Sequence, residues 1–154
     1  RIRSQKLKSY RKGNHNMSRI LGVDLGDVRT GLAVSDPTGF LASGIGFIRT
    51  VGLTQTAREV AQKAKELRCE RIIIGNPVNM NGTAGPRSEK SKLFCEMLLE
   101  QTDIPTELYD ERLTTASAHV YLNETDIKRK KRRTVVDTLS AEIMLQNYLD
   151  SHRS

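Results

Sequence analysis

The hydrophobic pattern of the chain changes period near residue 50, and this change limits the folds that the chain can adopt. Before it, residues 20–26 (ILGVDLG) and 29–36 (RTGLAVSD) have the pattern of two strands joined by a tight turn. A third strand is expected near 44–50. Its alternating apolar residues are Ile45, Phe47 and, less clearly, Ile48. Three short consecutive strands with short connections predict an antiparallel meander.

After this point the apolar residues fall at helical spacing from Ala57 to Leu67. A β-branched run with no polar face, RIIIG at 71–75, is typical of a strand covered on both sides. The elements expected next are a turn-rich loop at 76–88, a helix around 93–98, a strand at 105–110, a short helix from Thr114 or Thr115 to about Leu122, and a long helix ending near Leu149. The order predicts an α/β fold with a mixed five-stranded sheet and helices on both faces.

The positive charge of the chain is concentrated in two segments. Residues 1–16 hold six of the 25 basic residues and no acidic one, so the rest has 19 basic and 18 acidic residues and a net charge of +1. Residues 128–133 (KRKKRR) hold another six, and we expect this run to precede the long last helix. The first segment lacks apolar periodicity, so we expect residues 1–16 to be a basic appendage outside the fold and 17–152 to form one domain.

Several classes of protein are disfavoured by composition. The apolar runs are far shorter than the roughly 20 residues that span a bilayer. The two cysteines, Cys69 and Cys95, form no CxxC pair and have no ligand-spaced histidines, so neither a zinc site nor a disulfide framework is indicated. These features predict a soluble protein with free thiols in a reducing compartment and no membrane partner.

Two acidic residues occupy positions where the pattern expects apolar ones. Asp24 lies in a buried strand, where a carboxylate costs several kcal/mol unless it finds a cation, donors or the strand end. Asp137 lies on the same helical stripe as Ala141, Met144 and Tyr148. The alternatives are a structural hydrogen bond for Asp24 and a solvated acid near the helix start for Asp137.

A third acidic position follows the fifth strand, where Asp110 and Glu111 are adjacent. Successive strand residues face opposite sides, so only one of the two can share a face with Asp24. Carboxylates from two strands and one helix are ligands that a hard divalent ion such as Mg²⁺ or Mn²⁺ prefers. Such a site can support phosphodiester cleavage.

Four segments, in this order, resemble the YqgF family, also called RuvX, whose members are described as pre-16S rRNA nucleases and Holliday junction resolvase-like proteins. They are ILGVDLGDVRTGLAVSDPTG, RIIIGNPVNMNGTAGPR, YDERLTT and KRRTVVDTLSAEIMLQNYLD. The resemblance spans about residues 19–150 and implies an RNase H-like fold. It also implies a metal-dependent nuclease that processes the 5′ end of pre-16S rRNA, or cleaves junction DNA. Asp24, Glu111 and Asp137 match the acids of the family, and they are the predicted catalytic and metal-binding residues.

Two positions depart from the family pattern. Gly75-Asn76-Pro77 stands where the family more often has Gly-Leu-Pro and where resolvases of the same fold carry a glutamate, which puts a two-metal arrangement in doubt. Asp27 replaces the common Thr or Ser of the first loop and is an additional ligand candidate.

Basic residues near these acids are candidates for substrate binding. The KRKKRR run supplies Lys130, Lys131, Arg132 and Arg133 for contacts to a nucleic-acid backbone, with a mobile solvated loop as the alternative. Arg29 and Arg112 are further candidates, either for phosphate or for charge balance. Arg87 is a phosphate candidate in the loop NMNGTAGPR, for which a flexible strand-to-helix connector is the alternative. With no Trp, three Phe and four Tyr, shape and phosphate recognition fit better than an aromatic stacking platform.

Three functions remain open from the sequence. The first is a nuclease acting on pre-16S rRNA or branched DNA, as a monomer or weak homodimer. The second is a non-catalytic RNA-binding factor in ribosome assembly. The third follows from the turn in VDLGDVRTG, which also resembles the first phosphate loop of actin-like ATPases, although those folds need a second large domain.

Overall fold

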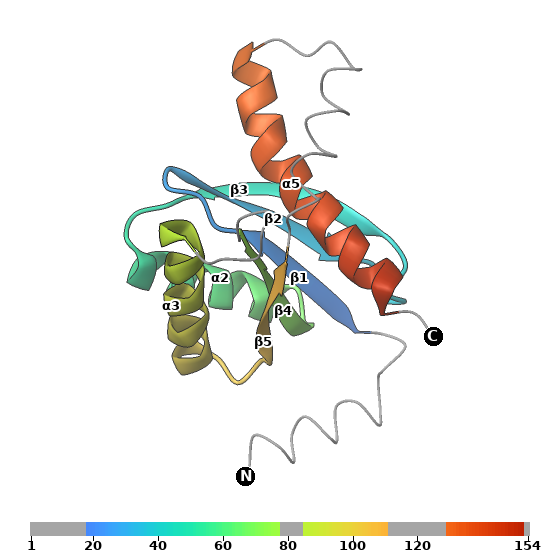
Figure 1. The fold of residues 1–154 in the computed structure, drawn as a ribbon. Helices are drawn as coiled ribbons and strands as arrows, with labels where there is room; N and C mark the ends of the chain where they lie inside the picture. Colours follow the sequence, from blue (N-terminus) through green and yellow to red (C-terminus); the bar gives the residue numbers. More distant parts are fainter. Residues whose placement is uncertain (1–17, 78–84, 111–128, 153–154) are drawn as a thin grey trace.

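The structure is a computed structural model that describes residues 18–77, 85–110 and 129–152, with side chains from Thr138 onward in the last range. Its elements are β1 (Arg19–Asp24), β2 (Arg29–Ser35), β3 (Ala42–Arg49), α2 (Leu53–Glu66), β4 (Cys69–Asn76), α3 (Pro86–Gln101), β5 (Thr106–Asp110) and α5 (Arg129–Ser151) (Figure 1). The short helix expected between Thr114 or Thr115 and Leu122 lies outside the described residues.

The five strands form one mixed sheet in the order β3-β2-β1-β4-β5. β1 and β3 each pair antiparallel with β2, which is the predicted meander. β4 adds parallel to β1, and β5 adds parallel to β4. The predicted fold class is therefore confirmed.

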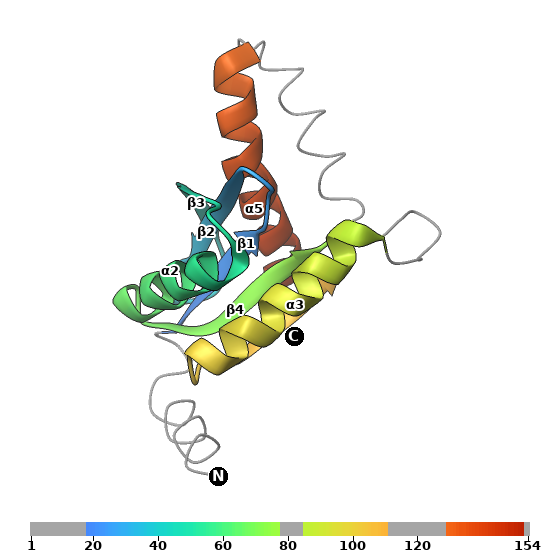
Figure 2. The same cartoon turned by 90° about the vertical axis from the view of Figure 1, so that its left-hand side faces the viewer.

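Helices cover both faces of the sheet and define its two cores (Figure 2). On one face, which we call the α2–α3 face, Leu21, Val23, Ile72 and Ile74 pack with Val60 and other residues of α2 and α3. On the opposite face, the α5 face, residues of α5 pack on the strands. The buried residues of this second core are Ala33, Ile73, Ala141, Met144, Leu145, Tyr148 and Leu149. The predicted inward stripe of the last helix is confirmed, because Ala141, Met144 and Tyr148 are all buried.

Two glycines let α5 approach the sheet closely. A Cβ atom on Gly22 would lie 3.0 Å from the Cβ of Leu145, and one on Gly44 would lie 2.3 Å from the Cγ2 of Thr138. Side chains of α5 also accept hydrogen bonds from the backbone of the edge strand β3. The Gly44 N–H donates to Glu142 Oε1 at 2.7 Å. One turn further along, the Ala42 N–H donates to Gln146 Oε1 at 2.9 Å.

The third strand differs from its predicted pattern. Ile48 packs against the α2–α3 core, whereas Ile45 and Phe47 are 40% and 41% exposed. The pairing of β2 with β3 shifts between Leu32 and Ala33, so β3 contains one extra residue there. This bulge reverses the alternation of side chains beyond it, which a strict two-residue period does not anticipate.

Two helices begin earlier than predicted. The loop expected at 76–88 ends sooner, because Pro86 occupies the first turn of α3, where its fixed φ favours helix and its missing N–H costs nothing. The buried side of α3 includes Ser88, Ser91, Phe94 and Leu98, and the predicted Leu93 is 46% exposed. The basic run does not precede the last helix, because α5 begins at Arg129.

Within the parts of the chain that the structure describes, no helix combines the length and the apolar character needed to cross a membrane.

Candidate active site at the carboxyl ends of β1 and β4

Asp24 is the last residue of β1, and strand alternation places it on the α5 face. Leu21 and Val23 belong to the α2–α3 core, whereas Ile20 packs against the α5 core. A side chain at Gly22 would meet Leu145 of α5. Asp24 is two residues after Gly22 and four after Ile20, so strand alternation places it with them on the α5 face. It is only partly buried, as expected at a strand end.

The direction of α5 relative to β1 leads the helix toward the level of Asp24 as it approaches position 137. The helix runs antiparallel to β1, since Ile20 lies near Leu149 whereas Gly22 lies against Leu145 and the carbonyl of Ala141. Two residues of strand advance about 6.6 Å and four residues of helix advance about 6 Å, so the two elements stay in step. Continuing from Gly22 to Asp24 therefore leads from Ala141 toward residue 137.

A tight turn follows Asp24 and is fixed by contacts of its own backbone. A Cβ atom on Gly26 would lie 2.1 Å from the carbonyl oxygen of Arg29, so only glycine fits there. The Thr50 hydroxyl donates to the Gly26 carbonyl at 2.8 Å, and the Thr50 N–H donates to the Val28 carbonyl at 2.9 Å. Thr50 and Thr30 also share a hydrogen bond of 2.7 Å between their hydroxyls.

Thr50 helps to position the site, and no sequence pattern predicts this role. Its partners lie 20 and 24 residues earlier in the chain, so no local pattern marks it. The meander brings the end of β3 beside the turn that follows β1. Thr50 therefore fixes the backbone two residues beyond Asp24.

Two of the predicted substrate-binding arginines lie at this end of the sheet. The Arg29 guanidinium carbon is 5.4 Å from the centre of the Phe47 ring. Arg87 lies in the first turn of α3, near enough to Asp27 to help lower the pKa of that carboxyl. The larger cause is Lys90, whose ammonium donates to Asp27 at 3.0 Å. This exposed ion pair links the turn to α3 and engages the additional ligand candidate Asp27.

The strand β5 distinguishes the two adjacent acids of the YDER segment. Leu108 packs on the α2–α3 core, and Tyr109 packs on the α5 core with its ring centre 5.6 Å from that of Tyr148. Asp110 is two residues after Leu108, so the two side chains lie on the same face, and Asp110 pairs in register with Asn76. It therefore lies on the face opposite to Asp24. Glu111 lies outside the described residues.

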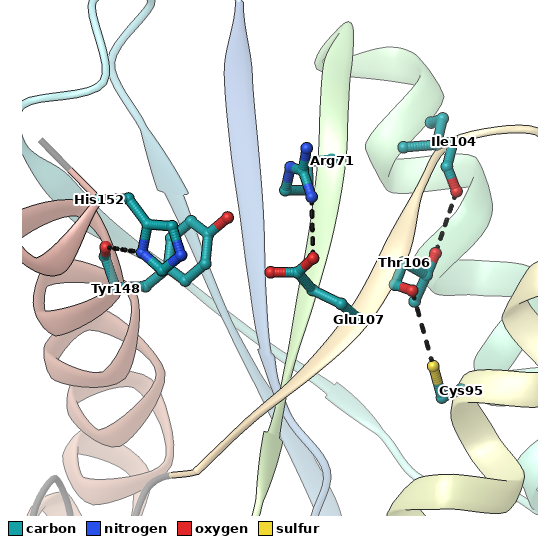
Figure 3. Close-up of polar contacts among 7 residues, drawn as sticks. All are labelled: Arg71, Cys95, Ile104, Thr106, Glu107, Tyr148 and His152. Atoms are coloured by element: carbon teal, nitrogen blue, oxygen red, sulfur yellow. Dashed lines mark hydrogen bonds and ion pairs between the residues drawn. The ribbon is translucent and has the colours of Figure 1, made fainter. Parts of the chain in front are cut away.

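Polar contacts hold β5 in its register before it reaches the YDER segment (Figure 3). Arg71 of β4 and Glu107 of β5 form an ion pair of 2.8 Å between Nη1 and Oε2. The Thr106 hydroxyl donates to the Ile104 carbonyl at 3.1 Å, and the Cys95 thiol contacts the Thr106 carbonyl at 3.9 Å. The ion pair is partly exposed and contributes about 0–1 kcal/mol, so it sets the register more than the stability.

Asn76, at the departure from the family pattern, is engaged on the α2–α3 face. Its Oδ1 accepts a hydrogen bond of 2.7 Å from the buried Ser88 hydroxyl in the first turn of α3. Asn76 thus helps to hold the start of α3 against the sheet and does not share the face of Asp24.

Several predicted site residues are placed only in part or not at all. Arg112, like Glu111, lies outside the described residues. The backbone of α5 includes Lys130, Lys131, Arg132, Arg133 and Asp137, but their side chains lie outside the described part. Among the side chains that are described, no three from His, Cys, Asp and Glu form a group able to hold a metal ion.

A cavity of about 520 Å³ lies at the other end of the sheet and does not include Asp24. Its lining includes Ser18, Pro37, Tyr148 and His152. The His152 ring stacks on Tyr148 with 3.9 Å between the ring centres, and its Nδ1 lies 2.9 Å from the Tyr148 carbonyl. We locate the candidate site at the strand ends because Asp24, Asp27, Arg29 and Arg87 lie there.

The chain has close relatives along most of its length. It is 44% identical over 133 residues to a protein of Clostridium novyi, which covers 86% of this chain and 98% of the relative. It is 46% identical over 132 residues to a protein of Clostridioides difficile, which covers 86% and 94%. Both relatives are named "Putative pre-16S rRNA nuclease".

Solved structures of low sequence identity share the fold. RuvC of Thermus thermophilus in complex with a Holliday junction matches with a TM-score of 0.55 and 13% identity, over 88% of this chain and 96% of that one. The fowlpox virus resolvase with its junction DNA matches with a TM-score of 0.56 and 14% identity, over 88% and 99%. These matches support the RNase H-like fold.

The family described as "RuvX: Holliday junction resolvase" matches residues 18–151 of this chain, which include the whole described sheet and α5. The names of the relatives and the description of the family both indicate a nuclease, which is an enzyme that hydrolyses phosphodiester bonds. The chain therefore belongs to the RuvX family of nucleases.

Proposed function

We propose that the chain is a metal-dependent nuclease of the cytoplasm that processes the 5′ end of pre-16S rRNA. Asp24, Glu111 and Asp137 hold a Mg²⁺ or Mn²⁺ ion in this proposal, and Arg29, Arg87, Arg112 and Lys130 to Arg133 bind the substrate backbone. Residues 1–16 stay outside the catalytic domain, in agreement with a family match that begins at residue 18.

The placement of Asp24 carries this proposal. It ends a central strand on the α5 face, at the level of position 137 of α5, which supports a shared site for the two carboxylates. Asp110 lies on the other face, so strand alternation favours Glu111 as the third member. Three carboxylates offer the oxygen ligands that a hard divalent ion requires.

When bound, such an ion activates a water for attack on phosphorus and stabilises the charge on the leaving oxygen. The residues of the chain supply position and charge. Arg29 and Arg87 lie near the turn that follows Asp24, where they can neutralise phosphates on either side of the cleaved bond. The turn itself is held by Thr50, so the Asp24 backbone is fixed before substrate binds.

The names of the relatives favour pre-16S rRNA as the substrate. The family description favours a second candidate, the four-way DNA junction. A twofold junction would suit a weak homodimer, whereas a single cut in RNA needs only a monomer. Both substrates require the same chemistry at Asp24.

A cleavage assay with and without Mg²⁺ or Mn²⁺ tests the proposal on both substrates. Wild-type protein is expected to cut pre-16S rRNA only with metal, and Asp24→Asn is expected to reduce the rate by at least about 100-fold while still binding RNA. Asp103→Asn makes the same change in the exposed loop before β5 and is the control. Cleavage by Asp24→Asn at the wild-type rate would disprove the assigned role. Binding of RNA without cleavage by any variant would favour an assembly factor.

A further inference from the structure

An aromatic side chain lies in line with Asp24 across the sheet. Asp24 of β1 pairs with Gly31 of β2, and Gly31 pairs with Phe47 of β3. Adjacent strands are about 4.8 Å apart, so Phe47 lies about 10 Å from Asp24 on the row. The residue between them has no side chain, and its backbone is buried. The carboxylate and the aromatic ring are therefore separated by one buried backbone position, with no side chain between them.

The bulge in β3 brings Phe47 to the same face as Asp24. Gly44 faces α5, where its position contacts Thr138, and regular alternation would turn residue 47 to the opposite face. The extra residue in β3 reverses this, with Gly46 at a φ of 104° that favours glycine. Ile48 then packs in the α2–α3 core and Phe47 emerges on the α5 face.

The Phe47 ring is exposed, and the positively charged side chain of Arg29 lies over it. Phe47 is 41% exposed, so a large part of its ring can be reached from solvent. The Arg29 guanidinium lies over the ring at 5.4 Å. A base can stack on an aromatic ring or on a guanidinium plane, and the guanidinium can also pair with phosphate. The pair thus suits a nucleotide better than an apolar protein surface.

We propose that Phe47 and Arg29 form a subsite for an unpaired nucleotide that flanks the cleaved phosphodiester. The proposal rests on the nuclease function proposed above and narrows its substrate class to RNA that is single-stranded beside the cleavage point. The separation of about 10 Å from Asp24 assigns the stacked base to a flanking nucleotide, not to the one that bears the cleaved phosphate. The low aromatic content of the chain is compatible with one such position.

The test compares two RNAs of one sequence, with the cleavage region either single-stranded or paired to a complementary strand. Binding is measured by fluorescence anisotropy in the Asp24→Asn background, so that no substrate is consumed. Phe47→Leu is expected to bind the single-stranded RNA about 5- to 150-fold more weakly, because stacking of one base on a ring is worth about 1–3 kcal/mol. The affinity for the paired RNA is expected to change less than about twofold.

Two further variants separate stacking from a structural effect. Phe47→Tyr keeps the ring and is expected to bind like wild type, and Ile45→Ala removes an equally exposed side chain of the same strand without effect on RNA. With 2-aminopurine in the flanking position, wild type is expected to quench the fluorescence and Phe47→Leu is not.

Equal losses on both RNAs, failure of Phe47→Tyr to bind, or a change of oligomeric state in Phe47→Leu would overturn the subsite. If the binding pattern holds but Asp24→Asn cleaves normally in the separate assay, the subsite stands and the metal mechanism falls.

Discussion

At the scale of single residues, the turn after Asp24 depends on glycine at position 26. A methyl group there would lie 2.1 Å from the Arg29 carbonyl oxygen, and backbone cannot yield as a flexible side chain does. We expect Gly26→Ala to lower the free energy of unfolding by about 1–3 kcal/mol and to reduce cleavage by moving Asp24. Urea denaturation and the cleavage assay measure the two effects.

The neighbouring Val28→Ala is the control, since Val28 is 59% exposed in the same turn. It is expected to retain both stability and activity. Wild-type behaviour of Gly26→Ala would mean that the turn does not fix Asp24.

Burial makes the two cysteine thiols harder to ionise. Both cysteines are free and buried, and burial raises the pKa of Cys69 to about 12 and also raises that of Cys95. At pH 8 the Cys69 thiolate fraction is then on the order of one in ten thousand. We expect iodoacetamide to leave Cys69 unmodified in native protein and to modify it in urea, as measured by mass spectrometry. Equally fast modification in both states would contradict the burial.

At the scale of elements, the site depends on how closely α5 packs on the meander. Gly44→Ala would bring a methyl group within 2.3 Å of the Thr138 side chain, one residue after Asp137. We expect α5 to shift, with a loss of about 1–3 kcal/mol in stability and a larger relative loss in cleavage than in RNA binding. Thermal denaturation, cleavage and binding by one preparation give the comparison.

Ser43→Ala is the matched control, because Ser43 is exposed on the same strand. It is expected to behave like wild type. If Gly44→Ala also kept full activity, the position of α5 would not control the site.

The hydrophobic periods predicted most elements because each core strand and helix has a clear apolar face. They failed where a local feature changes the face. The bulge at Gly44 to Gly46 turned Phe47 outward from the predicted stripe, and buried serines at 88 and 91 concealed the inner side of α3. Pro86 looked like part of a loop, although proline is favoured in the first turn of a helix.

The candidate site was predictable only in part. An acid within a buried strand pattern identified Asp24, since charge there is costly without a purpose. Strand alternation left Asp110 and Glu111 open, and the packing of Leu108 and Tyr109 on opposite faces placed Asp110 away from Asp24. Thr50 was not predictable, because its partners are brought near by the fold alone.

At the scale of the whole molecule, positive charge is concentrated in the basic run 128–133 at the start of α5, whereas the strands of the sheet carry basic and acidic residues in similar numbers. α5 continues by about 13 Å beyond Thr138 to Arg129, at 1.5 Å per residue, and its first five residues are basic. Figure 1 shows this end of α5 extending past the sheet. Each phosphate contact contributes about 0.7–0.9 to the salt slope of binding. We expect Gln at positions 130–133 to lower the slope for RNA by about 3.

Anisotropy titrations at several salt concentrations measure this slope. Gln at Arg58, Lys63, Lys65 and Arg68, on and just after α2, changes the same number of charges on the other side of the sheet. This control is expected to change the slope by less than about 1. An equal effect of the two variants would show that binding depends on net charge alone.

The proposed mechanism requires Asp24, Glu111 and Asp137 to converge on one divalent ion at the α5 face. Anomalous diffraction from crystals grown with Mn²⁺ would locate this ion. We predict a peak about 2.0–2.3 Å from a carboxylate oxygen of each of the three residues, and its loss in Asp24→Asn. A peak elsewhere, or none beside Asp24 in wild-type protein at saturating Mn²⁺, would show that these three carboxylates do not form the metal site.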